Sequence, residues 1–347
     1  MEKQRNIALD WMRFAACILV ILQHVTEYYY VSPDFTPNCS DNTVLVGIFN
    51  SISRVSVPLF TMISGYLLLP MKQDTHQFFK RRFMRILYPF IVWSLVYSVW
   101  FAIRSDSTFT EWTLSVLRLP FIYQAEHLWY VYMLIGLYLL IPILSPWLQS
   151  VSKRELQGYL ALWLFTTLLP YLRLWIPELG ADTYFNPTPT FYYFSGFVGY
   201  LLLGYYMRSY HPFTTLQAVV AIIAGWIVTS WIFLYQLYHT NTLPELELSW
   251  GFATINVVLM TCGMFVLLSQ ISISRYRHLN QAIISISTLS YGIYLCHVLW
   301  HATYMAIFMP LFDNVLLVSL CVVPLTFASA YVTIYLLHKL PIGKYIC

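Results

Sequence analysis

The sequence predicts an all-α, polytopic membrane protein with about ten transmembrane helices. Of its 347 residues, 59% are hydrophobic and only 10% are charged, less than half the share of about 25% found in soluble proteins. Its apolar runs reach about 20 residues, enough for a helix to cross a bilayer, and short polar connectors separate them. Such runs are about twice as long as the alternating strands of a membrane β-barrel. The composition therefore excludes a β-barrel, a cytosolic enzyme, a coiled coil, a disordered chain and a nucleic-acid-binding protein.

Each transmembrane helix is predicted from one apolar run. The first run carries Asp10 and Arg13 and is too long for the hydrophobic region of a cleaved signal peptide, so we expect it to remain a helix of the protein. Because every connector is short, residues 1–347 are expected to form a single transmembrane domain with no appended soluble domain. The predicted spans are 8–30, 44–69, 83–103, 128–146, 156–176, 191–207, 215–238, 250–271, 287–309 and 315–337.

The distribution of Lys and Arg predicts that both termini are cytoplasmic. Basic residues near the ends of transmembrane helices favour the cytoplasmic side. With the N-terminus inside, the outer segments hold only Arg104, Arg118 and Arg173. The inner segments then hold 14 of the 19 basic residues, namely Lys3, Arg5, Lys72, Lys80, Arg81, Arg82, Arg85, Lys153, Arg154, Arg208, Arg275, Arg277, Lys339 and Lys344.

The first span carries four ionisable residues, Asp10, Arg13, His24 and Glu27. Such residues are costly inside a membrane and indicate a functional site. Arg13 and His24 are eleven residues apart, so they share one helix face and lie about 16 Å apart along its axis. Asp10 precedes Arg13 by one turn on nearly the same stripe. The structural alternative is that Asp10 pairs with Arg13 at the interface while His24 bonds a neighbouring carbonyl.

Two further arginine positions are candidates for binding anions. Arg54 lies near the middle of the second span, where its guanidinium needs a partner such as Glu27 or a bound anion. A purely structural pair with a carboxylate is the alternative. At the inner end of the third span, Arg82 and Arg85 share a helix face, and paired guanidinium groups can hold phosphates. The two basic residues before Arg82 fit better as anchors to anionic lipid.

Histidine and aromatic residues in the fourth and ninth spans complete the candidate set. His127 and Trp129 open the fourth span, although Trp129 also fits an aromatic belt at the outer interface. The ninth span contains Tyr294 and His297, with His301 one turn further on. Two histidines at this spacing can bind a metal, but the span offers no carboxylate or third ligand beside them. We therefore expect no metal site.

Taken in order, these segments resemble acyltransferase family 3 of integral membrane proteins. The resemblance covers nearly the whole chain, and the stretch around Arg54 is most similar to the branch that O-acetylates enterobacterial common antigen. The segments that carry it are Leu9-Asp10-x-x-Arg13, the pair Arg13 and His24, Ser53-Arg54-Val-Ser-Val-Pro-Leu-Phe with Ser64-Gly65-Tyr66, Arg82-x-x-Arg85, His127-Leu-Trp129, and Ser290-Tyr-Gly-Ile-Tyr-Leu-Cys-His297.

The resemblance implies an enzyme of the bacterial inner membrane. It would move an acyl group, usually acetyl from cytoplasmic acetyl-CoA, to a hydroxyl of a cell-surface glycan or a lipid-linked glycan precursor. Acetyl-CoA would be a co-substrate, with no permanently bound cofactor. Two positions depart from the family pattern, since Thr61 and Tyr130 stand where phenylalanine is more usual. Both affect the expected shape of the acceptor site more than the reaction.

The chemistry of such a transfer agrees with the residues present. A sugar hydroxyl is a poor nucleophile until a base removes its proton, and a neutral imidazole suits that role. We assign His24 as the general base, with Arg13 and Asp10 in the catalytic set. Arg82 and Arg85, together with Arg13, would bind CoA. The substrate-binding candidates are Arg54, Glu27, His127, Trp129, Tyr294 and His297.

Two other classes of function use the same residues. A transporter or flippase of a glycan or lipid intermediate could line its substrate path with these charges. A signalling or assembly protein could use them only as structural pairs. Release of CoA from acetyl-CoA in the presence of a glycan would distinguish the enzyme from both.

Overall fold

The computed structural model describes residues 5–176, 195–271 and 277–347, and these residues confirm the all-α prediction. Helices make up most of the described chain, which contains no β-strand beyond an isolated bridge between Val31 and Pro37. In order, the helices are α1 (Ile7–Tyr30), α2 (Asp41–Phe49), η1 (Asn50–Val55), α3 (Ser56–Leu68), α4 (Thr75–Arg104), α5 (Phe109–Leu117), η2 (Glu126–Leu128), α6 (Trp129–Ser150), α7 (Lys153–Thr166), α8 (Leu169–Leu172), α9 (Val198–Tyr210), α10 (Thr215–Leu237), α11 (Leu243–Leu246), η5 (Leu248–Trp250), α12 (Ile255–Ser269), α13 (Arg277–Phe308), α14 (Val315–His338) and η6 (Gly343–Tyr345).

Among the described residues, 8 helical segments are long and apolar enough to cross a membrane. Each corresponds to one predicted span. They are Ile7–Tyr30, Asp41–Leu68, Thr75–Arg104, Glu126–Ser150, Thr215–Leu237, Leu248–Ser269, His278–Phe308 and Val315–His338.

The fifth and sixth predicted spans differ from the prediction, because the structure has shorter helices there. α7 has 14 residues and α9 has 13. At 1.5 Å per residue each is about 20 Å long, less than the hydrocarbon core of about 30 Å. Residues 191–194 of the sixth predicted span lie outside the described residues, as do the predicted inner residues Lys3 and Arg275.

Helix starts are set by side chains that accept hydrogen bonds from the first free backbone amides. Asn6 caps α1 by accepting from the amide of Ala8, and Asp74 caps α4 by accepting from the amide of Gln77. α4 therefore begins eight residues before the predicted third span, which draws the Arg-x-x-Arg segment into the helix. Such caps typically contribute about 1 kcal/mol each.

The second predicted span is not one continuous α-helix. Residues Asn50–Val55 form the 3₁₀ turn η1 between α2 and α3. Pro58 lies in the first turn of α3 and has no amide hydrogen to bond the carbonyl of Arg54 four residues earlier. The chain therefore tightens before Pro58, and Arg54 lies in this turn.

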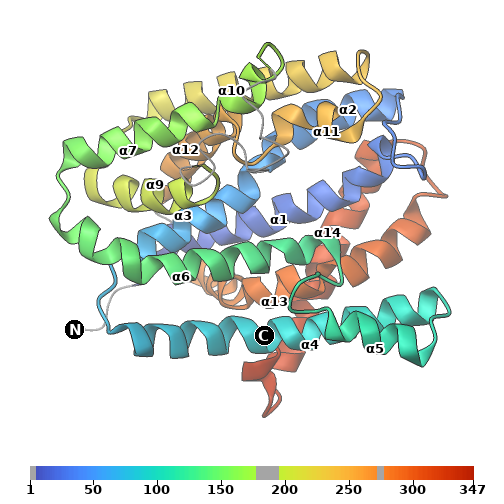
Figure 1. Ribbon diagram of the computed structural model, residues 1–347. Helices are drawn as coiled ribbons and strands as arrows, with labels where there is room; N and C mark the ends of the chain where they lie inside the picture. Colours follow the sequence, from blue (N-terminus) through green and yellow to red (C-terminus); the bar gives the residue numbers. More distant parts are fainter. Residues whose placement is uncertain (1–4, 177–194, 272–276) are drawn as a thin grey trace.

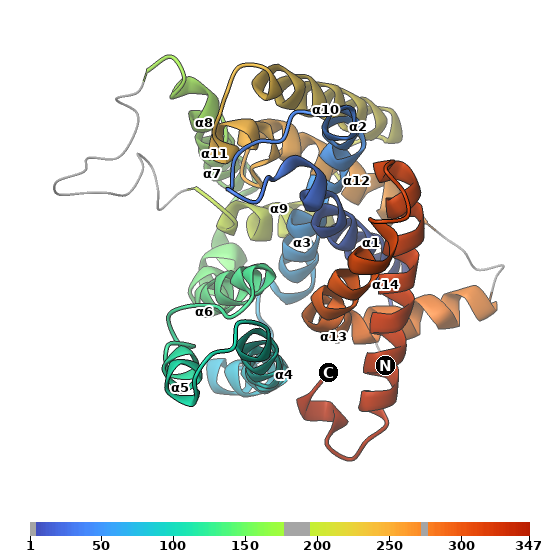
Figure 2. The same ribbon diagram turned by 90° about the vertical axis from the view of Figure 1, so that its right-hand side faces the viewer.

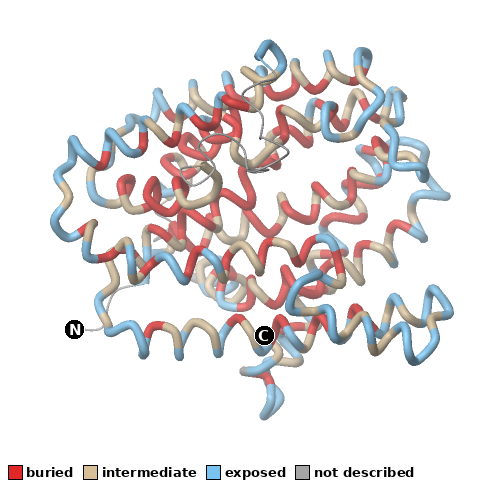
Figure 3. The backbone as a smooth tube through the Cα atoms, viewed as in Figure 1, coloured by how far each residue is buried: buried red, intermediate tan, exposed pale blue. Residues whose placement is uncertain are grey.

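α1 and α3 lie in the middle of the bundle, with α10 on one side and α4 on the other (Figure 1). Figure 2 shows the bundle turned by 90°, with α1 again enclosed by α3, α12, α13 and α14. Buried residues concentrate along these inner helices, whereas exposed residues lie on the outer faces (Figure 3). The candidate residues of the first span are thus held on the most enclosed helix.

α3 and α9 cross at a pair of glycines. A Cβ added at Gly65 would lie 2.0 Å from the carbonyl oxygen of Leu201, and one at Gly204 would lie 2.0 Å from that of Met62. The two backbones touch here, as small residues permit in membrane helices. Arg208 of α9 then donates hydrogen bonds to the carbonyls of Tyr66 and Leu69 at the end of α3.

Gly204→Ala is expected to destabilise the protein by about 1–3 kcal/mol, because the new methyl group forces two packed backbones apart. The thermal unfolding midpoint in detergent measures this loss. Gly158→Ala in α7 is the matched control, since a Cβ there meets no atom within 4 Å. Equal midpoints for the two variants would contradict the close crossing.

Candidate active site

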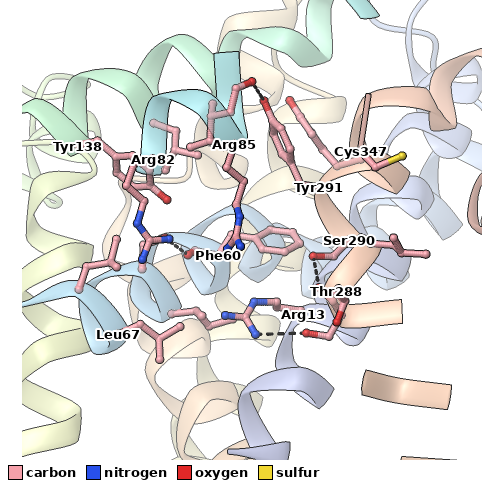
Figure 4. A pocket seen from close by; sticks show the side chains of 18 of the residues that line it. Arg13, Phe60, Leu67, Arg82, Arg85, Tyr138, Thr288, Ser290, Tyr291 and Cys347 are labelled. Atoms are coloured by element: carbon pink, nitrogen blue, oxygen red, sulfur yellow. Dashed lines mark hydrogen bonds between the residues drawn. The ribbon is translucent and has the colours of Figure 1, made fainter. Parts of the chain in front are cut away.

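Three arginines predicted from the sequence converge on one pocket of about 930 Å³. Arg13 reaches it from α1, and Arg82 and Arg85 reach it from the opposite side on α4 (Figure 4). Arg5 and Arg81 also line it. We call this space the arginine pocket. Its size lies within the range of about 300–1,000 Å³ typical of small-molecule sites.

Asp10 holds two of these arginines in place. Arg5 forms a two-pronged hydrogen bond with the Asp10 carboxylate at 2.8 and 2.9 Å, and Arg13 approaches the same carboxylate at 3.3 Å. Ser287 of α13 donates to Asp10 at 2.6 Å. The bond to Asp10 raises the pKa of Arg5. Asp10 is buried, so in this structure it supports the arginines from behind the pocket.

The remaining lining keeps the pocket cationic. Within the described chain, no Asp or Glu lines it. The buried Nε of Arg82 has no hydrogen-bond partner. Burial raises the pKa of the Cys347 thiol to about 11, so the thiol itself stays neutral near neutral pH. The pocket is therefore suited to a ligand that carries several negative charges.

Four histidines meet near the C-terminal end of α1, on the helix stripe that begins at Arg13. His24 of α1 has ring centroids of His297, His301 and His127 at 5.3, 6.0 and 6.2 Å. His127 precedes α6, and His297 and His301 lie one turn apart on α13. We call these residues the histidine cluster. No group of residues able to hold a metal ion is found in the described parts of the chain.

Hydrogen bonds define how two members of the cluster are oriented. His297 Nδ1 donates to the carbonyl of Tyr294 at 2.6 Å, which leaves its buried Nε2 as an acceptor without a partner. His127 Nε2 lies 3.3 Å from the carbonyl of Leu295, and the Tyr294 hydroxyl donates to the His127 carbonyl. Tyr294 therefore ties α13 to the segment that carries His127.

His24 is the accessible member of the cluster. Its side chain is 23% exposed, whereas His127, His297 and His301 are buried. Glu27 is 39% exposed and places its carboxylate 3.5 Å from His24 Nδ1. A carboxylate on Nδ1 favours the tautomer that leaves Nε2 free to accept a proton. His24 is thus both oriented and reachable from outside.

Two predicted substrate residues lie beside other partners. Arg54 is 9% exposed, and its guanidinium lies 3.9 Å from the ring centroid of Trp250. It makes no ion pair with Glu27 in the structure, and its buried Nε and Nη2 have no hydrogen-bond partner. Trp129 packs against Phe252, with ring centroids 5.8 Å apart, rather than against the histidine cluster. Glu27 pairs with His24 instead of Arg54, because residues three apart on one helix are neighbours on its surface.

A comparison with protein families identifies the family of the chain. Residues 6–336 match the acyltransferase domain of acyltransferase family 3, and the match covers nearly the whole described bundle. The chain belongs to this family. No match is found among curated proteins or among solved structures. The family therefore establishes a membrane acyltransferase, and the finer features rest on the chain itself.

Three residues of the site were not among the sequence candidates. Arg5 and Arg81 line the arginine pocket, although Arg81 fitted a lipid anchor and Arg5 fitted only the inner charge bias. His301 stacks on His24 with an angle of 15° between the rings. Its spacing from His297 was the available signal, but spacing along α13 does not reveal which helix faces it.

Proposed function

We propose that this acyltransferase moves an acetyl group from cytoplasmic acetyl-CoA to a hydroxyl of a cell-surface glycan or lipid-linked glycan precursor. The observation that carries the proposal is the placement of an arginine pocket and an oriented histidine at the two ends of one stripe of α1. Membership in an acyltransferase family supports the enzyme over a transporter or flippase.

The donor is assigned from the charge and shape of the arginine pocket. CoA carries several phosphate charges at one end and its thioester at the other. Arg82 and Arg85 would bind phosphates, with Arg13 and Arg5 held ready by Asp10. Since Arg13 and His24 are about 16 Å apart along α1, a donor lying lengthwise would bring its thioester toward His24.

The transfer step assigns one role to each group near His24. Nε2 of His24 accepts the proton of the acceptor hydroxyl as its oxygen forms a bond to the thioester carbonyl carbon. The carbon–sulfur bond then breaks, and the proton passes from His24 to the departing CoA thiolate. Glu27 orients His24 and stabilises the imidazolium that forms in between. The free Nε2 of His297 can accept a hydrogen bond from the acceptor.

The acceptor would approach the exposed side of His24 and Glu27. Arg54, His127, Trp129 and Tyr294 are proposed to shape this side of the site, Arg54 through its unpartnered nitrogen atoms. Its guanidinium could orient the acceptor or stabilise the oxyanion. The acceptor sugar is left open, because several hydroxyl compounds would meet these requirements.

The purified protein in detergent or lipid nanodiscs tests the function directly. Incubation with acetyl-CoA and a candidate glycan should release CoA in proportion to acetylated glycan detected by mass spectrometry. A panel of lipid-linked and free glycans provides the acceptors. Failure of every acceptor, with CoA bound but not consumed, would contradict the proposed function.

Both termini are proposed to lie in the cytoplasm of a bacterium, with the protein in the inner membrane. The basic residues near the helix ends support this orientation. A reporter enzyme that works only in the cytoplasm should be active when it is fused after Cys347, whereas one that works only in the periplasm should be inactive. Activity of a periplasmic reporter at the same position would reverse the orientation and put the arginine pocket on the wrong side for cytoplasmic CoA.

A further inference from the structure

A narrow space lies between the arginine pocket and the histidine cluster. It has no room for a water molecule. We call it the neck. Its lining consists of Cys17, Val20, Ile21, Phe60, Ile293, Tyr294 and His297.

The neck shares lining residues with the arginine pocket at one end and with the histidine cluster at the other. Phe60 and Tyr294 also line the arginine pocket, and His297 belongs to the histidine cluster. On α1, Cys17 follows Arg13 by one turn and Val20 precedes His24 by about one turn. One face of α1 thus borders the pocket, the neck and the cluster in succession.

Aromatic rings close the neck toward the arginine pocket. Tyr130 lies between Phe60 and Tyr294, with ring centroids at 6.3 and 5.4 Å. The hydroxyl of Tyr294 is fixed by its hydrogen bond to the His127 carbonyl. Phe60 has no polar group to fix it and is only half-buried, so it is the ring that can turn aside at the lowest cost.

We propose that the neck is the passage for the acyl end of the donor, and that its width excludes branched acyl groups. The inference rests on the proposed function. The acyl group is the leading end of a donor whose phosphates stay in the arginine pocket. It must therefore pass Phe60 and Tyr294 before its carbonyl reaches His24.

The neck selects by size because its walls are close-packed. A packed interior resists even one added methylene, and one methylene in an apolar site typically changes specificity by about 10–200-fold. An acetyl group requires the smallest displacement of Phe60 and of the α1 side chains that line the neck. An isobutyryl group carries two methyl groups side by side and would have to displace Phe60 further or disturb Val20.

Phe60→Ala is the test, with acetyl-CoA and isobutyryl-CoA as competing donors. The ratio of kcat/KM for isobutyryl-CoA to that for acetyl-CoA should rise by ~10-fold or more, because the movable ring is gone. Val20→Ala should raise the ratio in the same direction from the opposite wall. Cys17→Phe should lower transfer from both donors while CoA binding persists, since it fills the neck without touching the arginines.

Phe83→Ala is the matched control, because Phe83 lies on α4 against Phe79 and lines neither space. Its donor ratio should equal that of the parent. An unchanged ratio in both Phe60→Ala and Val20→Ala, with acetyl transfer intact, would overturn the neck as a selector and leave the proposed function standing. Absence of transfer from any donor in the parent protein would instead remove the proposed function itself.

Discussion

His24→Gln is expected to lower acyl transfer by about 10²–10⁴-fold, the usual contribution of one positioned base. Glutamine keeps a polar side chain next to Glu27 but cannot accept the proton of the acceptor hydroxyl. His24→Ala should be equally inactive. Acetylated glycan measured by mass spectrometry gives the rate, and thermal unfolding verifies that both variants fold.

CoA binding separates a lost base from a damaged site. Arg13, one of the proposed phosphate-binding arginines, lies about 16 Å from His24 along α1, so CoA affinity should be unchanged in His24→Gln. His239→Gln, at an exposed residue near the end of α10, is the matched control and should retain full activity. Parental turnover in His24→Gln would return His24 to a structural role in the cluster.

Much of the fold could be predicted because hydrophobic length is a local property of the sequence. Eight apolar runs became long helices in the expected places. The break at η1 was missed because an apolar run does not reveal a local change from α to 3₁₀ geometry. α7 and α9 are shorter than the spans predicted there, because hydropathy indicates an apolar run but not where a helix within it begins and ends.

The candidate site shows the same difference between what local sequence predicts and what tertiary packing decides. Arg82 and Arg85 were predictable as a pair because their spacing fixes a common face. Whether Arg82 and Arg85 face Arg13 depends on how α4 is placed relative to α1, which the sequence does not give. The three arginines were nevertheless assigned to one site, because all three could bind the negatively charged CoA. The stacking of His301 on His24 and the contact of Arg54 with Trp250 arise from tertiary packing alone. No spacing within one helix encodes them.

The second large expected effect is a loss of CoA affinity in the arginine pocket, which can be measured without any acceptor. Replacing both Arg82 and Arg85 by Ala should weaken CoA binding roughly 100-fold. Each charged hydrogen bond contributes about 1.5 kcal/mol or more, and 1.4 kcal/mol corresponds to about tenfold in affinity. Calorimetry with CoA measures the change. Acetyl-pantetheine, which lacks the phosphates of CoA, should bind the variant and the parent equally.

The control for this double variant must remove the same charge from elsewhere. Lys153→Ala with Arg154→Ala does so at the start of α7, where neither residue lines the pocket. It should leave CoA affinity intact, whereas a non-specific attraction of CoA to a basic surface would weaken it as much. Added salt should reduce binding to the parent more than to the variant without Arg82 and Arg85, since salt screens charge interactions. Parental affinity in that variant would leave both arginines as anchors to anionic lipid and would move the phosphate contacts to Arg5 and Arg13, the two that Asp10 holds in place.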